Sequence, residues 1–198
     1  MRNQWYADHR DLVKWGSLLH LAAVYHLRSI LQIAFLTPDN NPIVIHSELG
    51  DIGVDPRVLC HFRNVRRISE LTHDHGPRIQ VFPEPFTAHS RQEYQDAALA
   101  AAHAVARPTA IFLDPDTGLA EKPSSSKHVT SREVAAFWSA LQVSDWLVLY
   151  QHAARETGWP EARRESFAHA VGGASVITFR SSNGARDVVL FAAVRGAA

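Results

Sequence analysis

The sequence predicts one α/β domain over residues 1–198: a three-layer sandwich with a mostly parallel sheet and a C-terminal antiparallel hairpin. Two observations carry this prediction. Apolar runs of strand length alternate with segments of helical periodicity, which is the pattern of βαβ units. Near the C-terminus, two strand-like runs flank a segment that contains Asn183-Gly184, a strong signal for a hairpin turn.

Periodicity and turn residues give the bounds of the predicted elements. The predicted helices cover residues 12–27, 91–106, 131–141 and 160–171, and residues 56–71 fit a further helix. The predicted strands cover residues 29–36, 78–82, 109–113, 146–150, 175–179 and 187–194. Ser90 and Thr130 each precede a Glu by three residues, so we expect a capping box at the start of the second and third helices.

Composition excludes some classes of function. The 20 Lys and Arg residues balance the 20 Asp and Glu residues, which removes the usual electrostatic case for tight non-specific binding to nucleic acid or to an anionic membrane. No apolar run approaches the roughly 20 residues that a membrane span needs. Charged residues among the first dozen argue against a signal peptide. The sequence therefore predicts a cytoplasmic protein without a membrane partner.

Polar residues follow three of the predicted strands at the point where each strand ends. Thr37 and Asp39 follow the first strand, Asp114 and Asp116 follow the third, and His152 follows the fourth. In open α/β sheets, ligands bind outside the carboxyl ends of the strands. We therefore expect these side chains to line the active or ligand site.

The pair Asp114 and Asp116 is the most informative part of this set. Asp114 directly follows a buried strand, so its carboxylate needs a cation, a metal or a hydrogen-bond donor to offset desolvation. Two carboxylates suit either a divalent metal such as Mg²⁺ or Mn²⁺, or proton transfer by the one whose pKa is raised. Downstream, Lys127 follows three serines and suits an anionic group such as a phosphate.

Several of these motifs together resemble a bacterial protein family. The segment from Asn3 to Lys14 is similar to the family's opening, Asn-Gln-Tyr-Phe-Gly-Asp followed by Asp-Tyr-x-Lys. The family also has Leu-Thr-Pro-Asp, Phe-Phe-Asp-Pro-Asp-Asn-Gly-Leu, Ser-Ser-Lys and Val-Tyr-Gln-His, which this chain matches at residues 36–39, 111–119, 125–127 and 149–152. This resemblance implies functional roles for Asp8, Asp11, Lys14 and Lys127.

The order of elements is also distantly similar to the ribosomal RNA adenine-N6 methyltransferases, which have a Rossmann-like methyltransferase fold. Those enzymes open with a helix bearing Asp and Lys, and their catalytic strand ends in Asp-Pro-Pro-Tyr, where this chain has Asp-Pro-Asp-Thr from Asp114. The resemblance implies that Asp114 binds an acceptor amine and that Asp39 lies near S-adenosylmethionine. The stacking aromatic and the glycine-rich turn after the first strand are both missing here.

Three hypotheses follow from the sequence. The first is a methyltransferase-fold enzyme acting on a nucleotide or nucleic acid, with Asp114, Asp116, Lys127 and His152 as catalytic candidates. In it, S-adenosylmethionine is bound near Asp8, Asp11, Lys14, Thr37 and Asp39. The second is a metal-dependent nuclease or phosphodiesterase, in which Asp114 and Asp116 hold Mg²⁺ or Mn²⁺. The third is a non-catalytic binding module on a degenerate methyltransferase fold.

Overall fold

The computed structural model describes most of the chain, namely residues 9–36, 44–47, 50–53, 65–72, 76–87, 89–120, 127–154, 157–180 and 185–196. Its helices are α1 (His9–Val24), η2 (Val65–Leu71, a 3-10 helix), α3 (Arg91–Ala104), α4 (Ser131–Ala140) and α5 (Trp159–Ala170). Its large sheet contains β1 (Ser29–Ile33), β4 (Arg78–Val81), β5 (Thr109–Leu113), β8 (Trp146–His152), β9 (Ile177–Arg180) and β10 (Val188–Val194).

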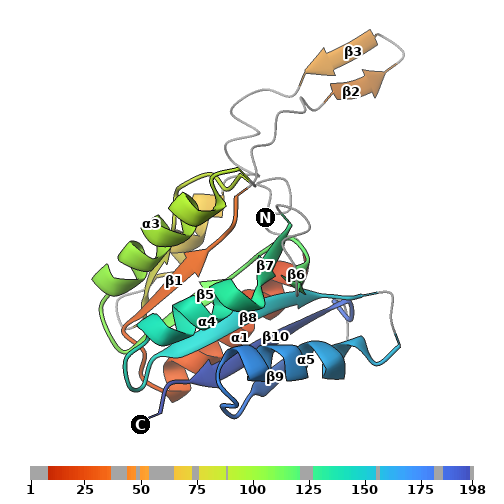
Figure 1. Ribbon diagram of the computed structural model, residues 1–198. Coiled ribbons are helices and arrows are strands. Elements are labelled where there is room, and N and C mark those ends of the chain that lie inside the picture. Colours follow the sequence, from red (N-terminus) through yellow and green to blue (C-terminus); the bar gives the residue numbers. More distant parts are fainter. Residues whose placement is uncertain are drawn as a thin grey trace.

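In the described part of the chain, this sheet has the strand order β4-β1-β5-β8-β10-β9 (Figure 1). The first four strands are mutually parallel, and β10 runs antiparallel to both of its neighbours. The predicted fold class is therefore confirmed: a mostly parallel sheet between helices, closed by an antiparallel hairpin, which is a Rossmann-like, methyltransferase-like arrangement. The sequence predicted the hairpin as the last pair of strands, and β9 and β10 form it.

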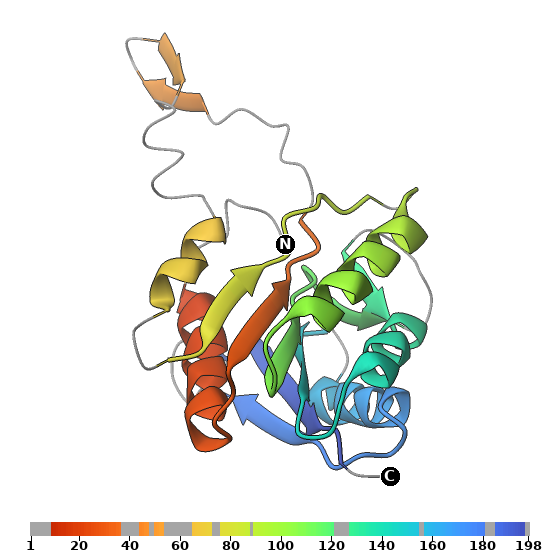
Figure 2. The ribbon, with the colours of Figure 1, turned by 90° about the vertical axis from the view of Figure 1, so that its left-hand side faces the viewer.

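Two cores lie on opposite faces of the sheet, with α1 on one face and α3, α4 and α5 on the other (Figure 2). Side chains alternate between them along each strand, because successive residues of a strand point to opposite faces. On β5, Ile111 and Leu113 belong to the core under α3, α4 and α5, whereas Ala110 and Phe112 belong to the core under α1. The same alternation directs the next even-numbered residue, Asp114, toward α1.

The bounds of several elements differ from the sequence prediction for local reasons. β1 ends at Ile33 rather than at residue 36, because Phe35 has a left-handed φ of 47° and Leu36 pairs instead with Pro85. The capping box at Thr130 is confirmed. The one predicted at Ser90 is wrong, because the Ser90 hydroxyl lies 2.6 Å from the Thr87 hydroxyl and makes no cap bond.

Two small sheets accompany the large one. β2 (Val44–Ser47) and β3 (Gly50–Gly53) form an antiparallel pair, and β6 (Gly118–Ala120) lies parallel to β7 (His128–Thr130). The β6–β7 pair occupies what the sequence predicted as a loop, and it orders the segment directly after Asp114. Within the described residues, no helix is both long and apolar enough to cross a membrane.

Candidate functional site

The candidate site lies at the edge of the sheet where β1, β5 and β8 have their carboxyl ends and β10 begins. After β1 the chain adds β4 on one side, and it later adds β5 on the other side of β1. The strand order therefore reverses between β1 and β5, and such a switch point is where open α/β sheets bind their ligands. Asp114 stands there: its backbone N–H donates to the carbonyl of Ile33, over 2.9 Å.

Four polar side chains at this point form what we call the buried cluster: Asp11, Lys14, Gln32 and Asp114. Lys14 Nζ lies 3.2 Å from each carboxylate oxygen of Asp114 and 2.9 Å from Oδ1 of Asp11. Gln32 Nε2 donates to Asp114 Oδ2 over 2.7 Å. The side chains of Lys14, Asp11 and Asp114 are only 7%, 8% and 1% exposed. The cation that the buried carboxylate of Asp114 requires is therefore Lys14.

Electrostatics hold Lys14 in its charged form. Burial by itself lowers the pKa of Lys14, but the carboxylates of Asp114 and Asp11 outweigh it and raise that pKa above its ordinary value. Lys14 Nζ also lies 4.7 Å from the ring centre of Tyr150, a favourable cation–π position. Burial raises the pKa of the Tyr150 phenol, so this ring stays neutral beside the ions.

The segment after Asp114 is held by Gln151 at the end of β8. Its Oε1 accepts the Leu119 N–H over 2.9 Å, and its Nε2 donates to the carbonyls of Thr117 and His152 over 3.0 and 2.8 Å. Gly118 makes this possible: its φ is +112°, and a Cβ there would lie 2.3 Å from Gln151 Oε1. The glycine in the predicted motif is thus required by a close approach of Gln151.

A second group at the same edge, which we call the edge trio, consists of Arg10, His152 and Asp187. Arg10 donates to Asp187 Oδ2 from Nε over 3.0 Å and from Nη2 over 2.6 Å. His152 Nε2 lies 3.2 Å from the same oxygen. The Arg10 hydrogen bond, with the Arg10 charge, lowers the pKa of Asp187, so this carboxylate is ionised at neutral pH. About a third of each side chain is exposed.

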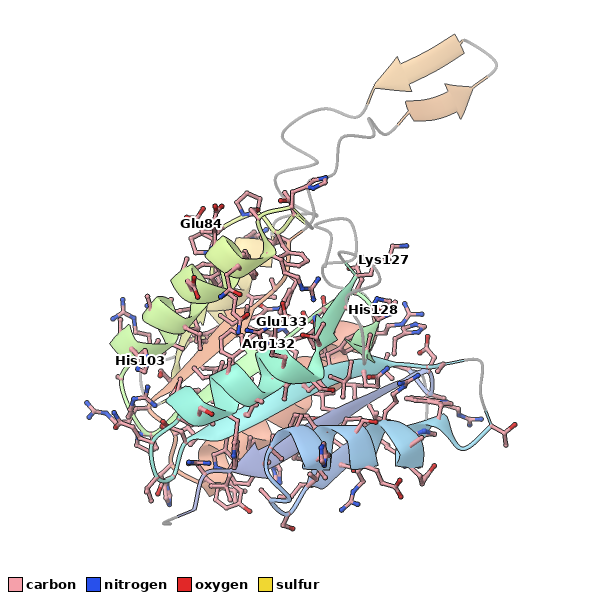
Figure 3. The ribbon with its side chains drawn as sticks, viewed as in Figure 1. Glu84, His103, Lys127, His128, Arg132 and Glu133 are labelled. Atoms are coloured by element: carbon pink, nitrogen blue, oxygen red, sulfur yellow. The ribbon has the colours of Figure 1, made fainter. Side chains whose placement is uncertain are left out.

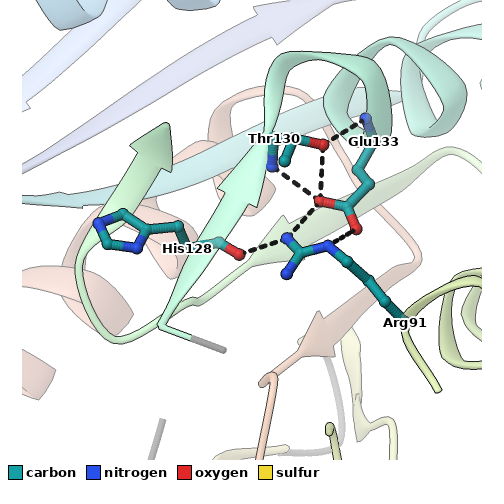
Figure 4. A network of polar contacts seen from close by, with 4 residues as sticks. All are labelled: Arg91, His128, Thr130 and Glu133. Carbon is teal, nitrogen blue, oxygen red and sulfur yellow. Dashed lines mark hydrogen bonds and ion pairs between the residues drawn. The ribbon is translucent and has the colours of Figure 1, made fainter. Parts of the chain in front are cut away.

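Basic side chains gather near the start of β7, where Lys127 is exposed and His128 is half-buried (Figure 3). Burial lowers the pKa of His128, and the charges of Arg163, Arg91 and Lys127 lower it further. Arg91 is itself engaged: it donates to both carboxylate oxygens of Glu133 and to the carbonyl of His128 (Figure 4). Lys127 is exposed and is the last residue of the predicted anion-binding segment, Ser124 to Lys127.

The structure brings together most of the site residues that the sequence predicted. Asp11, Lys14 and Asp114 share the buried cluster. Thr117 links Lys127 and His152. Its N–H and hydroxyl donate to the carbonyl of Lys127, and its carbonyl accepts the His152 N–H. Asp116, half-buried, lies in the same segment. The predicted residues Asp8, Thr37 and Asp39 lie outside the described residues.

Sequence reasoning missed Gln32, Asp187 and the role of Gln151. For Gln32 a signal was present, because it is the one amide within a strand that is otherwise apolar after Ser29. For Asp187 there was none, since it meets Arg10 across 177 positions of the chain. Among the described residues, no group of three or more His, Cys, Asp or Glu side chains is placed to hold a metal ion. The predicted Mg²⁺ or Mn²⁺ site at Asp114 and Asp116 stays a prediction.

Comparison with known proteins gives a distant structural similarity. No protein-family model matches the chain, and no curated protein matches it. A solved structure from Thermobifida fusca YX, provisionally described as a methyltransferase, is similar to this chain; the match covers 95% of this chain and 80% of that structure's chain. The two chains are 14% identical, and their TM-score is 0.47.

Proposed function

We propose that this protein binds S-adenosylmethionine at the edge between β1 and β5 and transfers its methyl group to a nucleotide or a nucleic acid. The observation that carries the proposal is the buried cluster at the switch point, where Gln32 of β1 and Asp114 after β5 are joined over 2.7 Å. A ligand site in this class of sheet lies directly outside that junction. Bound there, the cofactor supplies a sulfonium methyl group for transfer to a nucleophile.

The residues beside the junction fit such a ligand. Glu84 is exposed and lies three residues beyond β4, the strand next to β1, in a segment that pairs with the continuation of β1 at Leu36 and Pro85 (Figure 3). A carboxylate in this place suits the ribose hydroxyls of a nucleoside, because it accepts hydrogen bonds from both. On the other side, the exposed Lys127 suits a phosphate of the acceptor.

In this proposal, Asp114 has a positioning role. Both of its oxygens are bound to Lys14, one also to Gln32, and its side chain is almost fully buried. A carboxylate held in this way fixes the ends of β1 and β5 and the start of α1 relative to one another. The acceptor is then contacted by the exposed or half-exposed groups of the same edge, Asp116, Lys127 and His152.

Calorimetry with S-adenosylmethionine and with S-adenosylhomocysteine tests cofactor binding. We expect saturable binding of both, and Glu84→Gln weakens it by about 10- to 100-fold because hydrogen bonds to a charged acceptor are lost. Glu165→Gln, an exposed change on α5, is the matched control and leaves the affinity unchanged. Absence of heat and of any thermal shift with millimolar ligand would refute the proposal.

One observation favours a second candidate, a non-catalytic binding module. Where a methyltransferase of this fold has a glycine-rich turn after its first strand, this chain has Phe35, buried and with φ +47°. Its backbone N–H donates to the Tyr94 hydroxyl over 3.0 Å and is not available to a cofactor. Binding of S-adenosylmethionine or a nucleotide without any methylated product, from mixed nucleotides or RNA, would favour this second candidate.

A further inference from the structure

The edge trio has the geometry of an oriented histidine. Its members come from three elements that are distant in sequence: Arg10 from α1, His152 from the end of β8, and Asp187 from the residue before β10. The Arg10 guanidinium and the His152 imidazole converge on one oxygen of Asp187, at 2.6 and 3.2 Å. A carboxylate fixed by a guanidinium has little freedom to turn away, so it holds the ring in one orientation.

The charge of Asp187 decides which ring nitrogen carries the hydrogen. The Arg10 hydrogen bond lowers the pKa of Asp187, so its carboxylate is ionised, and one of its oxygens lies 3.2 Å from His152 Nε2. The other ring nitrogen, Nδ1, lies 3.4 Å from the carbonyl of Ala153, which is a longer contact to an uncharged acceptor. A hydrogen bond to an ionised group is the stronger of the two, so a neutral ring carries its hydrogen on Nε2 and its lone pair on Nδ1.

His152 lies beside the proposed site. Its backbone N–H donates to the carbonyl of Thr117 over 3.1 Å, so the ring is anchored next to the segment that follows Asp114. The side chain is 34% exposed, which leaves it open to a substrate, unlike the buried cluster. Tyr150, two residues earlier on β8, interacts electrostatically with Lys14 and Asp114 of the buried cluster. It also interacts with Arg10 and Asp187 of the edge trio.

We propose that His152 is the catalytic base of this protein and that Asp187, held by Arg10, is its positioning residue. This inference rests on the proposed function. When a neutral amine attacks a sulfonium methyl group, the N–C bond forms, the S–C bond breaks, and the electron pair of that bond stays on the sulfur. The nitrogen becomes cationic and must lose one proton. His152 Nδ1 accepts that proton, and the ionised Asp187 stabilises the resulting imidazolium before it releases the proton to water.

The first experiment measures the tautomer and needs no cofactor. Nitrogen-15 NMR of the histidine rings is recorded at about pH 8.5, where an ordinary imidazole is neutral. We expect His152 to be protonated on Nε2 in the wild type and to become a mixture of both tautomers in Asp187→Ala. Predominant protonation on Nδ1 in the wild type, or an unchanged spectrum in Asp187→Ala, overturns the proposal.

The second experiment measures methyl transfer to RNA and to mixed nucleotides. His152→Gln keeps a donor for Asp187 but cannot take up a proton, and we expect turnover to fall by about 100- to 10,000-fold while S-adenosylhomocysteine binding is retained. His169→Gln, an exposed change on α5, is the control and keeps full turnover.

The two proposals fail in different ways. Equal turnover of His152→Gln and the wild type overturns the base and leaves the proposed function standing. A wild type without methyl transfer overturns the proposed function, and the tautomer spectrum then decides whether His152 is oriented as a base.

Discussion

The buried cluster and the edge trio lie at one edge of the sheet and use similar groups, yet their burial separates their roles. Each contains a basic side chain bound to a carboxylate. The side chains of Lys14 and Asp114 are 7% and 1% exposed, whereas about a third of each of Arg10, His152 and Asp187 faces solvent. Ions withdrawn from water must stay paired, and partly hydrated ions can exchange partners at little cost. The first group therefore fixes the strand ends, and the second is available for chemistry.

Of the substitutions that test this difference, Lys14→Met is expected to lower the unfolding free energy most. It leaves the carboxylates of Asp11 and Asp114 buried without their ammonium, which costs about 3–5 kcal/mol of unfolding free energy. Urea denaturation measures the loss, and Lys127→Met, an exposed lysine, is the control with a change below about 0.5 kcal/mol. Adding Asp114→Asn removes one uncompensated charge and recovers part of the loss. Equal stability of the two lysine variants would contradict the assignment.

Alkaline pH is expected to weaken the buried cluster. Folding raises the pKa of Lys14 from its ordinary 10.5 and that of Tyr150 from 10.0. A raised pKa means that the folded state holds the proton more tightly, so this stability is complete below about pH 10 and declines as the pH rises further. Urea midpoints between about pH 8 and pH 11 measure the decline, which Lys14→Met makes shallower. A urea midpoint that does not change above about pH 10 would contradict this stabilisation by the protonated groups.

Gly118→Ala tests the segment that connects the two regions. The backbone conformation at φ +112° is strained for alanine, and the new Cβ collides with the Gln151 side chain. We expect a cost of about 1–3 kcal/mol and a displaced segment from Asp116 to Leu119. Gly158→Ala, at φ +73° with open space around it, is the control for strain alone. A loss of unfolding free energy no greater than that of Gly158→Ala would show that the Gln151 side chain moves aside without penalty.

Asp187→Ala is expected to have the smallest effect on stability, although it removes the acceptor of the edge trio. Partly exposed ion pairs contribute about 0.2–1 kcal/mol, so thermal denaturation changes little. The contribution has a defined pH range: the pKa of Asp187 is lowered from its ordinary 3.8, so the contribution is present above that pH and is lost as the pH falls through the lowered value. A loss comparable to that of Lys14→Met would show that the two regions do not differ as proposed.

Local sequence signals were sufficient for the fold class but not for every element. Alternating periodicities predicted the parallel sheet and the closing hairpin, and the Thr130–Glu133 capping box formed as expected. The Ser90 box failed because the backbone there, with ψ 30°, is not extended and its hydroxyl bonds Thr87 instead. The β6–β7 pair was missed because strands of three residues have no measurable period.

The sequence by itself determined where the candidate site was expected. Asp114 ends a buried strand, and strand ends collect ligands, so both the place and the need for a compensating cation followed from local order. Only the tertiary structure decided which groups answer that need. Lys14 reaches Asp114 across 100 positions and Arg10 reaches Asp187 across 177, because α1 packs on the sheet. Sequence spacing carries no information about such contacts, since their distances depend on how elements pack rather than on the local chain.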